Sequence, residues 1–176
     1  MTALSPRDLV GGLLASIPDF PRPGILFRDL TPVFADAAAF KALIDDLVGH
    51  FKGTFDAVAG VEARGFLLAA AAAYATGTSL LVVRKSGKLP GDVLTEHYDL
   101  EYGADALELQ PRRHSPAARV LILDDVLATG GTLIAAARLV ERAGYTVSGL
   151  GVVLELTDLG GRAQLAGHQV HSILRL

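Results

Sequence analysis

The sequence predicts a single α/β domain covering residues 1–176, in which a parallel sheet is flanked by helices and carries a small antiparallel flap at about 85–109. Three observations predict it. A chain of 176 residues has the length of one domain. Its strand-like segments are continuous apolar runs, which is typical of strands buried on both faces of a parallel sheet. These runs alternate with stretches of helical periodicity, and that alternation favours an α/β architecture.

The first half of the chain is expected to alternate helices with strands. Ser5 can cap a helix whose first turn contains Pro6 and Asp8. Asp36 and Gly53 flank a run whose apolar residues share one helical face. The elements predicted in this half are a helix from Ser5 to near Pro18, a segment at 25–29 closed by Thr31-Pro32, a helix between the cap Asp36 and the stop Gly53, a strand at 57–61, an alanine-rich helix after a turn at 62–65, and a strand at 79–84.

The second half is expected to begin with the flap. Residues 85–92 are polar and punctuated by glycine and proline, which predicts a mobile loop. Residues 94–98 and 106–109 are predicted to form an antiparallel pair. The elements expected after them are a strand at 119–123, a helix at 132–143 ended by Gly144, a strand at 147–154, a short helix at 159–165 and a last strand at 169–174.

The composition excludes several classes of protein. A hydrophobic content of 51% excludes intrinsic disorder, and the lack of cysteine excludes disulfides and thiolate metal sites while suiting a reducing cytosol. The net charge of −3 argues against a dedicated nucleic-acid binder. No signal peptide is visible, and the most apolar stretch, 65–81, is shorter than the roughly 20 strongly apolar residues of a membrane span. We therefore expect neither nucleic acid nor a membrane as partner.

The sharpest signal is the segment Val120–Thr132, in which a buried strand ends in two carboxylates and a turn of small residues leads into a helix. Ligands of open α/β sheets bind beyond the carboxyl ends of the strands. Glycines let backbone N–H groups approach an anion, and the helix N-terminus adds positive potential. We therefore expect a phosphate on this turn, which consists of Ala128, Thr129, Gly130, Gly131 and Thr132.

The two carboxylates, Asp124 and Asp125, would repel a phosphate, so they are better matched to sugar hydroxyls or to a bridging metal ion. A phosphate beside a diol describes a ribose 5-phosphate. A P-loop is excluded because no lysine follows the glycines, and the G-x-G-x-x-G pattern of dinucleotide-binding folds is also missing. The alternative interpretation is a solvated strand end followed by a helix cap.

This segment resembles the phosphoribosyl-pyrophosphate (PRPP) signature of type I phosphoribosyltransferases. Four further segments resemble the adenine branch of that family: Pro23–Thr31, Glu62–Phe66, Val83–Pro90 and Tyr98–Gly103. The similarity runs from about residue 5 to residue 175. It implies the type I phosphoribosyltransferase fold and the conversion of adenine and PRPP to AMP and pyrophosphate. It also implies Mg²⁺, bound mainly through PRPP, and a cytoplasmic homodimer of purine salvage.

The resemblance assigns roles around the leaving group. Pyrophosphate must leave with its charge neutralised, while the anomeric carbon gains oxocarbenium character. The residues expected to bind it are Ala63, Arg64, Arg84 and Lys88. Arg64 and Glu101 are the expected catalytic residues; Glu101 would manage a proton of the purine as N9 attacks, and Tyr102 would orient the approach. The segment 85–102 is expected to close over the site and exclude water. The alternative is that the basic and flap side chains are solvated.

The resemblance also implies an adenine site. Phe27 is the expected platform for the flat purine, and Leu159 would cover its other face. Leu26 would read the base edge through its main chain, with Arg28 nearby. The alternative for Phe27 and Leu159 is ordinary core packing.

No histidine is assigned a catalytic role. His168 and His171 are three residues apart in a predicted strand, which places them on opposite faces and makes poor metal-ligand geometry.

Two other functions share most of these features. One is a transferase of the same class that acts on hypoxanthine, guanine or xanthine. The other is a PRPP-sensing regulator that binds without turnover, which the negative net charge disfavours. The sequence also departs from the family pattern at 67–70, where Gly-Pro is often found, and at 92–97, which does not match residue by residue.

Overall fold

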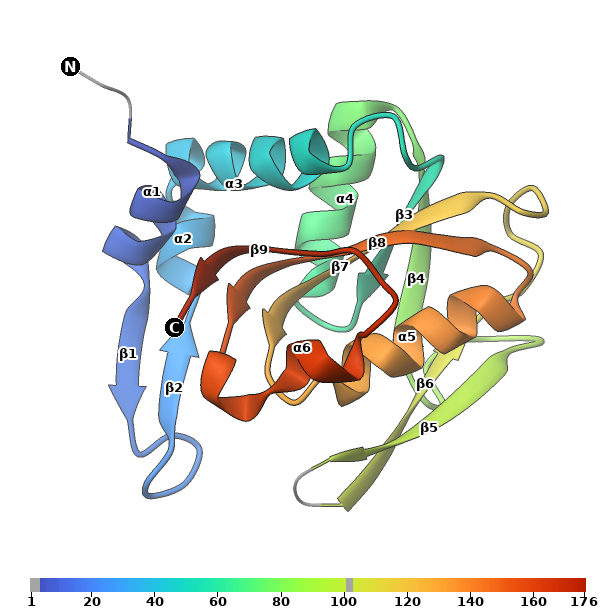
Figure 1. Cartoon of the computed structure of the whole chain (residues 1–176). Coiled ribbons are helices and arrows are strands. Elements are labelled where there is room, and N and C mark those ends of the chain that lie inside the picture. The colour runs from blue at the N-terminus through green and yellow to red at the C-terminus, as the bar shows by residue number, and fades with distance from the viewer. Residues whose placement is uncertain (1–3, 101–102) are drawn as a thin grey trace.

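The computed structural model describes residues 4–100 and 103–176 (Figure 1). A central sheet has seven strands in the order β5-β6-β4-β3-β7-β8-β9, and β1 pairs with β2 in a separate sheet. The strands are β1 (Ala15–Pro18), β2 (Leu26–Asp29), β3 (Ala57–Val61), β4 (Ser79–Lys85), β5 (Leu94–Leu100), β6 (Gly103–Leu109), β7 (Arg119–Leu127), β8 (Thr146–Glu155) and β9 (Val170–Arg175). The helices are α1 (Pro6–Leu13), α2 (Thr31–Ala35), α3 (Ala37–His50), α4 (Gly65–Thr76), α5 (Gly131–Arg142) and α6 (Gly161–Gln164), with a 3₁₀ turn η1 (Thr157–Leu159). None of the described helices is long and apolar enough to cross a membrane.

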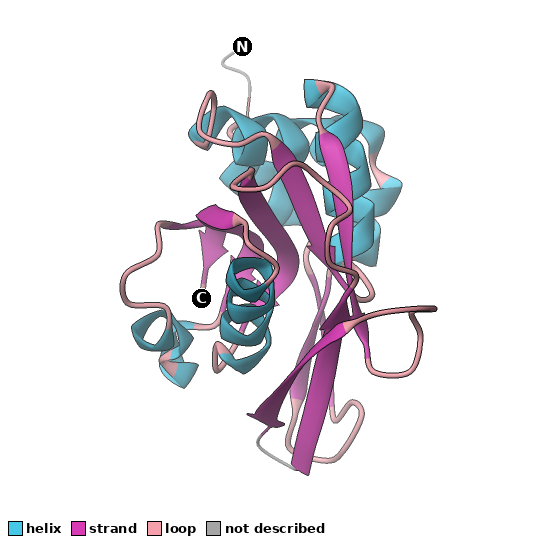
Figure 2. Cartoon of the chain, turned by 90° about the vertical axis from the view of Figure 1, so that its right-hand side faces the viewer, coloured by secondary structure: helices cyan, strands magenta, loops and turns pink. Residues whose placement is uncertain are grey.

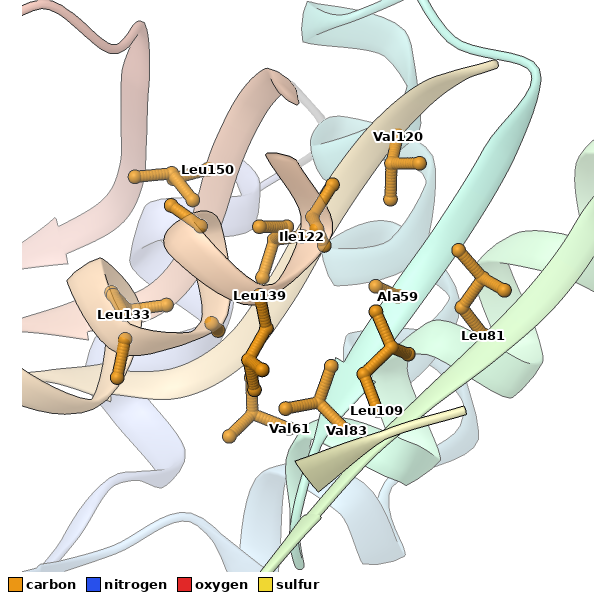
Figure 3. Packing of buried hydrophobic residues seen from close by; sticks show 14 of the residues in the cluster. Ala59, Val61, Leu81, Val83, Leu109, Val120, Ile122, Leu133, Leu139 and Leu150 are labelled. Carbon is orange, nitrogen blue, oxygen red and sulfur yellow. The ribbon is translucent and has the colours of Figure 1, made fainter. Parts of the chain in front are cut away.

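The central sheet confirms the predicted α/β fold. Strands β4, β3, β7, β8 and β9 are parallel, and β5 and β6 add an antiparallel pair at one edge. Successive residues of β7 face opposite cores: Val120 and Ile122 pack with residues of α5, and Leu121 and Leu123 with residues of α3 and α4. Figure 3 shows Ile122 beside Leu139 of α5. Both faces of the strand are covered, which explains its continuous apolar run.

The N-terminal segment departs from its prediction after the expected start. Ser5 Oγ accepts the Asp8 N–H at 3.2 Å and the Asp8 carboxylate accepts the Ser5 N–H at 3.3 Å, which forms a capping box. The helix ends at Leu13 and not near Pro18, because residues 15–18 pair with β2 as an antiparallel strand. Thr31-Pro32, expected to close a segment, begins α2, where a proline suits the first turn.

Two elements near the predicted phosphate turn also have different bounds. Strand β7 was predicted to end at Leu123 but runs to Leu127, because it pairs with β8 as far as Leu127 opposite Glu155. The two aspartates therefore lie within the strand and not beyond its end. The short helix predicted at 159–165 is interrupted at Gly160, whose φ of 65° separates η1 from α6.

The predicted flap is the hairpin of β5 and β6, which projects from the rest of the molecule in Figure 2. The start of β5, at residues 95–96, forms ion pairs and a hydrogen bond with α5. Glu96 of β5 forms ion pairs with Arg142 at 2.7 Å and with Arg138 at 3.3 Å. Arg142 Nη1 also donates to the Thr95 carbonyl oxygen at 2.8 Å. These contacts join the flap to the helix that follows the phosphate turn.

A buried carboxylate holds the C-terminal elements together. Glu155, at the end of β8, is only 2% exposed. It accepts hydrogen bonds from Arg162 Nε of α6 at 2.9 Å and from Ser172 Oγ at 2.7 Å, and Arg175 lies 3.2 Å away. These contacts, with Arg162 contributing most, lower the pKa of Glu155 from 4.5 to about 2.

Replacing Glu155 with glutamine is expected to reduce stability in a pH-dependent way. Because the folded-state pKa is depressed, the ionised carboxylate contributes stability that is fully present above pH 4.5 and is lost as the pH falls towards about 2. The free energy of unfolding at pH 7 should be lower by about 3 kcal/mol in Glu155→Gln, and the difference should narrow at pH 3. Urea unfolding of both proteins at each pH measures this difference. A difference that does not change with pH would contradict the assignment to the charge.

Candidate active site

A cleft of about 360 Å³ lies where β3, β4 and β7 end. The carboxyl ends of parallel strands meet at one edge of the sheet, which is where α/β sheets bind ligands. The residues lining the cleft are Glu62, Ala63, Arg64, Lys85, Tyr98, Asp105, Asp124, Asp125, Val126, Ala128 and Thr132. The fold therefore brings the predicted ribose residues together with parts of the predicted phosphate and pyrophosphate sites.

The turn Ala128–Thr132 encloses a second, smaller hollow of about 50 Å³ at the N-terminus of α5. Gly130 caps the helix with a φ of 90°, a conformation that favours glycine. The first N–H groups of a helix have no partner within it, so an anion in this hollow can accept them. The turn rests on α6: a Cβ atom added to Gly161 would lie 2.1 Å from the Ala128 carbonyl oxygen and 2.8 Å from the Gly130 nitrogen.

Asp124 and Asp125 lie beside this turn, and each is 7% exposed. The Asp125 carboxylate accepts a hydrogen bond from Arg64 Nε, and the Asp125 N–H donates to Asp124 Oδ1 at 2.9 Å. Burial, together with the neighbouring charge of Asp125, raises the pKa of Asp124 well above its usual range. Arg64 thus pairs with Asp125 only, which leaves carboxylate oxygens of the two residues able to bind hydroxyl donors or a metal ion.

The predicted pyrophosphate residues gather around a further acid, Glu62. The turn Ala63–Arg64 connects β3 to α4, and its first peptide bond, Glu62–Ala63, is cis. Arg84 Nε lies 3.4 Å from the Glu62 carboxylate, which also accepts a hydrogen bond from Lys88 Nζ. Arg84 Nη1 donates to the Lys88 carbonyl oxygen at 3.3 Å. Arg84 and Lys88 are therefore joined to the cleft through Glu62, which lines it, whereas neither of these two cations is itself a lining residue and Arg64 pairs with Asp125 instead.

Sequence reasoning missed three side chains that line the cleft from the flap side. Lys85 Nζ lies 2.8 Å from Asp105, and the Tyr98 hydroxyl donates to Asp105 at 3.4 Å. The hydrogen bond to Asp105 raises the pKa of Lys85. Tyr98 and Asp105 are register partners across β5 and β6, so their side chains share a face of the hairpin. Pairing the two predicted flap strands in register would have drawn attention to Tyr98, whereas Asp105 lies one residue before the predicted strand 106–109 and Lys85 belongs to β4.

The predicted adenine residues lie on two separate elements. The guanidinium carbon of Arg64 is 5.7 Å from the centre of the Phe27 ring, and the Phe20 ring meets Phe27 edge-on at 5.1 Å. Arg28 Nη1 donates to Ser16 Oγ of the paired strand at 2.5 Å. Phe27 thus adjoins the pyrophosphate residues.

Leu26 and Leu159 carry side chains that are 50% and 43% exposed. Leu159 belongs to η1, one residue before the Gly160–Gly161 segment that supports the phosphate turn. The predicted stacking of a purine between Phe27 and Leu159 stays a prediction. Glu101 and Tyr102 lie outside the described residues.

His171 contacts both His50 and Asp46, and none of these three residues lines the cleft. His171 of β9 contacts Asp46 at 2.6 Å, and its ring stacks on that of His50 at 4.0 Å. His168 precedes β9, so the expectation that His168 and His171 occupy opposite faces of one strand was wrong.

Comparison with known proteins identifies the family that this chain matches. The sequence pattern of the phosphoribosyl transferase domain matches residues 33–164. The chain is 69% identical to an adenine phosphoribosyltransferase of Clavibacter sepedonicus over 172 residues, which cover 98% of this chain and 90% of the relative.

Solved structures agree with this family. A crystal structure of adenine phosphoribosyltransferase from Thermoanaerobacter pseudethanolicus superposes with a TM-score of 0.92 at 44% identity, covering 97% of this chain and 99% of that one. The enzyme from Saccharomyces cerevisiae, solved with adenine and an imino-altritol bisphosphate, superposes with a TM-score of 0.90 at 36% identity, covering 96% and 98%.

Proposed function

We propose the roles below from the premise that this chain belongs to the adenine phosphoribosyltransferase family. Its function is the conversion of adenine and PRPP to AMP and pyrophosphate, a transferase reaction of purine salvage. The observation that carries the conclusion is a single cleft that joins the start of the phosphate turn, the Asp124–Asp125 pair and Arg64.

PRPP is held at its 5-phosphate and at its ribose hydroxyls. Its 5-phosphate occupies the turn Ala128–Thr132, where free helix N–H groups surround a hollow of about 50 Å³. Its ribose hydroxyls donate to Asp124 and Asp125, which line the adjoining cleft. Hydrogen bonds from neutral hydroxyls to carboxylates are charge-assisted, so they fix the sugar with its anomeric carbon facing the rest of the cleft.

Pyrophosphate leaves towards the basic end of the cleft. When the bond from the anomeric carbon to the pyrophosphate oxygen breaks, the electron pair goes to pyrophosphate and the sugar gains oxocarbenium character. Arg64, Arg84 and Lys88 then face the developing negative charge, and the turn at Ala63 offers its backbone. Cations fixed in advance stabilise the transition state more than mobile ones do.

Adenine stacks on Phe27 with its N9 towards the anomeric carbon. The 5.7 Å separation of Phe27 from the Arg64 guanidinium supports this placement, because it sets the base next to the leaving group. Leu159 covers the second face of the purine, the main chain of Leu26 reads its edge, and Arg28 lies nearby on the same strand.

Mg²⁺ binds as a complex with PRPP. The residues present fit the ion, since Mg²⁺ takes one or two carboxylates together with substrate phosphates and waters. Asp124 and Asp125 supply such carboxylates, and Arg64 pairs with only one of them. When bound, the ion neutralises charge on pyrophosphate.

Glu101 acts as a general acid or base toward a ring nitrogen of the purine while N9 attacks the anomeric carbon, and Tyr102 orients the approach of the purine. Glu101→Gln is therefore expected to lower kcat by about a hundredfold, the usual contribution of a general acid or base, with little change in the affinity for PRPP. Glu141→Gln, an exposed change on α5, is the matched control and should behave as wild type. Steady-state kinetics with both substrates measure the effect. A kcat equal to that of the control would remove Glu101 from proton transfer.

The segment 85–102 closes over the bound substrates and excludes water, which would otherwise hydrolyse PRPP. The position of Lys85 and Tyr98 at the cleft supports this role.

The enzyme works as a homodimer in the cytoplasm. Several apolar side chains are exposed on α4 and the adjacent β4, namely Leu67, Tyr74, Leu80 and Val82. Exposed apolar surface of this kind is typical of subunit contacts. The lack of cysteine suits a reducing compartment. Sedimentation equilibrium of the purified chain tests the dimer.

A product assay across purine bases tests the function. Adenine, hypoxanthine, guanine and xanthine are each incubated with the protein, PRPP and Mg²⁺, and nucleotide and pyrophosphate are measured. We expect AMP as the main product. A preference for a 6-oxopurine would indicate the related transferase, and tight PRPP binding without turnover of any base would indicate a sensor.

A further inference from the structure

Glu62 organises the basic end of the cleft, and none of the roles above uses it. Its side chain lines the cleft and is 9% exposed. One carboxylate oxygen, Oε2, accepts the Lys85 N–H at 2.9 Å and lies 3.4 Å from Arg84 Nε. The other, Oε1, accepts a hydrogen bond from Lys88 Nζ. A single carboxylate thus joins the end of β3 to the end of β4 and to the loop after it.

Glu62 is an anion whenever the site is intact. Burial opposes its charge, but the hydrogen bonds from Lys88, the Lys85 N–H and Arg84 outweigh burial and lower the pKa of Glu62 to about 2. With that pKa, Glu62 carries its negative charge near neutral pH.

We propose that Glu62 is a positioning residue for the leaving pyrophosphate, because it holds Arg84 and Lys88 at the border of the cleft before the substrate arrives. The inference rests on the proposed function. Arg84 and Lys88 are long side chains, 34% and 47% exposed, which would otherwise sample many rotamers. Glu62 removes that freedom in advance, so pyrophosphate meets cations that are already in place. The backbone hydrogen bond to Lys85 keeps Glu62 in position when the cations turn to the substrate.

A carboxylate next to cations also competes with an anionic ligand for them, so two effects oppose each other. Competition predicts that neutralising Glu62 strengthens PRPP binding, whereas positioning predicts that it weakens binding. Although Glu62 is nearly buried, Arg84 and Lys88 are partly exposed, so salt weakens the attraction between these charges, while it does not change the loss of side-chain freedom on binding. We therefore expect positioning to dominate.

The test is Glu62→Gln, which retains an oxygen for the Lys85 N–H but lacks the charge. We expect the KM for PRPP and the Kd for pyrophosphate to rise about tenfold, the cost of ordering two long side chains on binding. AMP has no pyrophosphate group, so its Kd should not change. Asp56→Asn is the matched control: it removes a carboxylate paired with Arg119 at 2.7 Å, outside the cleft, and should leave all three constants unchanged.

A double-mutant cycle separates positioning from a general structural role. If Glu62 acts through the two cations, Glu62→Gln should have no further effect on pyrophosphate binding in an Arg84→Ala, Lys88→Ala background. A full additional effect there, a parallel loss of AMP affinity, or tighter PRPP binding in Glu62→Gln would each overturn the proposal. If Glu62→Gln fails to fold, Glu62→Asp takes its place, with the same expected direction. A wild-type protein that forms no AMP would instead overturn the proposed function.

Discussion

Replacing both Asp124 and Asp125 with asparagine is expected to lower kcat/KM for PRPP by about a thousandfold, since each charge-assisted hydrogen bond to the ribose contributes about 1.5–3 kcal/mol. The same double variant should remain folded. Burial and the charge of Asp125 raise the pKa of Asp124, so its ionised form destabilises the folded state as the pH rises, and asparagine removes that cost. Steady-state kinetics and urea unfolding at pH 7 measure the two effects.

The control for this pair is Asp45→Asn, which removes an exposed carboxylate paired with Lys41 on α3. It should leave kinetics unchanged. If the double variant kept wild-type kinetics, the ribose could not lie against these aspartates. If it lost activity only because it unfolded, the urea titration would show it.

The second large effect is expected at a residue that touches no substrate. A methyl group on Gly161 would lie 2.1 Å from the Ala128 carbonyl oxygen and 2.8 Å from the Gly130 nitrogen, both of which are backbone atoms. The phosphate turn must therefore shift in Gly161→Ala, and a shift of about 1 Å in a binding group can cost about a hundredfold in activity. We expect the KM for PRPP to rise by about that factor, with a parallel loss of AMP affinity.

Gly49→Ala is the control for this substitution. Gly49 lies on α3 with no atom within 4 Å of an added Cβ, so the methyl group should leave activity unchanged and should favour the helix. An intact phosphate site in Gly161→Ala, measured by AMP binding, would show that α6 does not hold the turn in place.

Much of the fold could be predicted because local patterns and burial agree. The apolar run 57–61 became β3 without a change of bounds, since it is buried on both faces, and the Asp36 cap began α3 where expected. The prediction failed where pairing between distant segments decided the outcome. Residues 15–18 were predicted to continue the first helix, but they form strand β1 because β2 pairs with them. Strand β7 likewise runs past its predicted end at Leu123, because it pairs with β8 as far as Leu127.

In the candidate site, too, local features could be predicted from the sequence and contacts between distant segments could not. Residues contiguous in the sequence, such as 128–132, could be assigned from the chemistry of a helix N-terminus. Contacts between segments could not. Nothing in the sequence pairs Glu62 with Lys88, and Gly161 follows another glycine with no sign that a carbonyl group lies against it. These residues act through their neighbours, so only the three-dimensional arrangement reveals them.

The attachment of Glu96 to Arg138 and Arg142 limits how the flap can open. Residues 95–96 of strand β5 are held against α5, the helix whose first turn is the proposed phosphate site. If the flap opens, we therefore expect it to bend beyond residues 95–96, where the Asp105–Lys85 ion pair would have to break, and not to rotate as one rigid body. Such bending would leave the turn at the N-terminus of α5 in place, so under the proposed arrangement we expect pyrophosphate to be released before AMP.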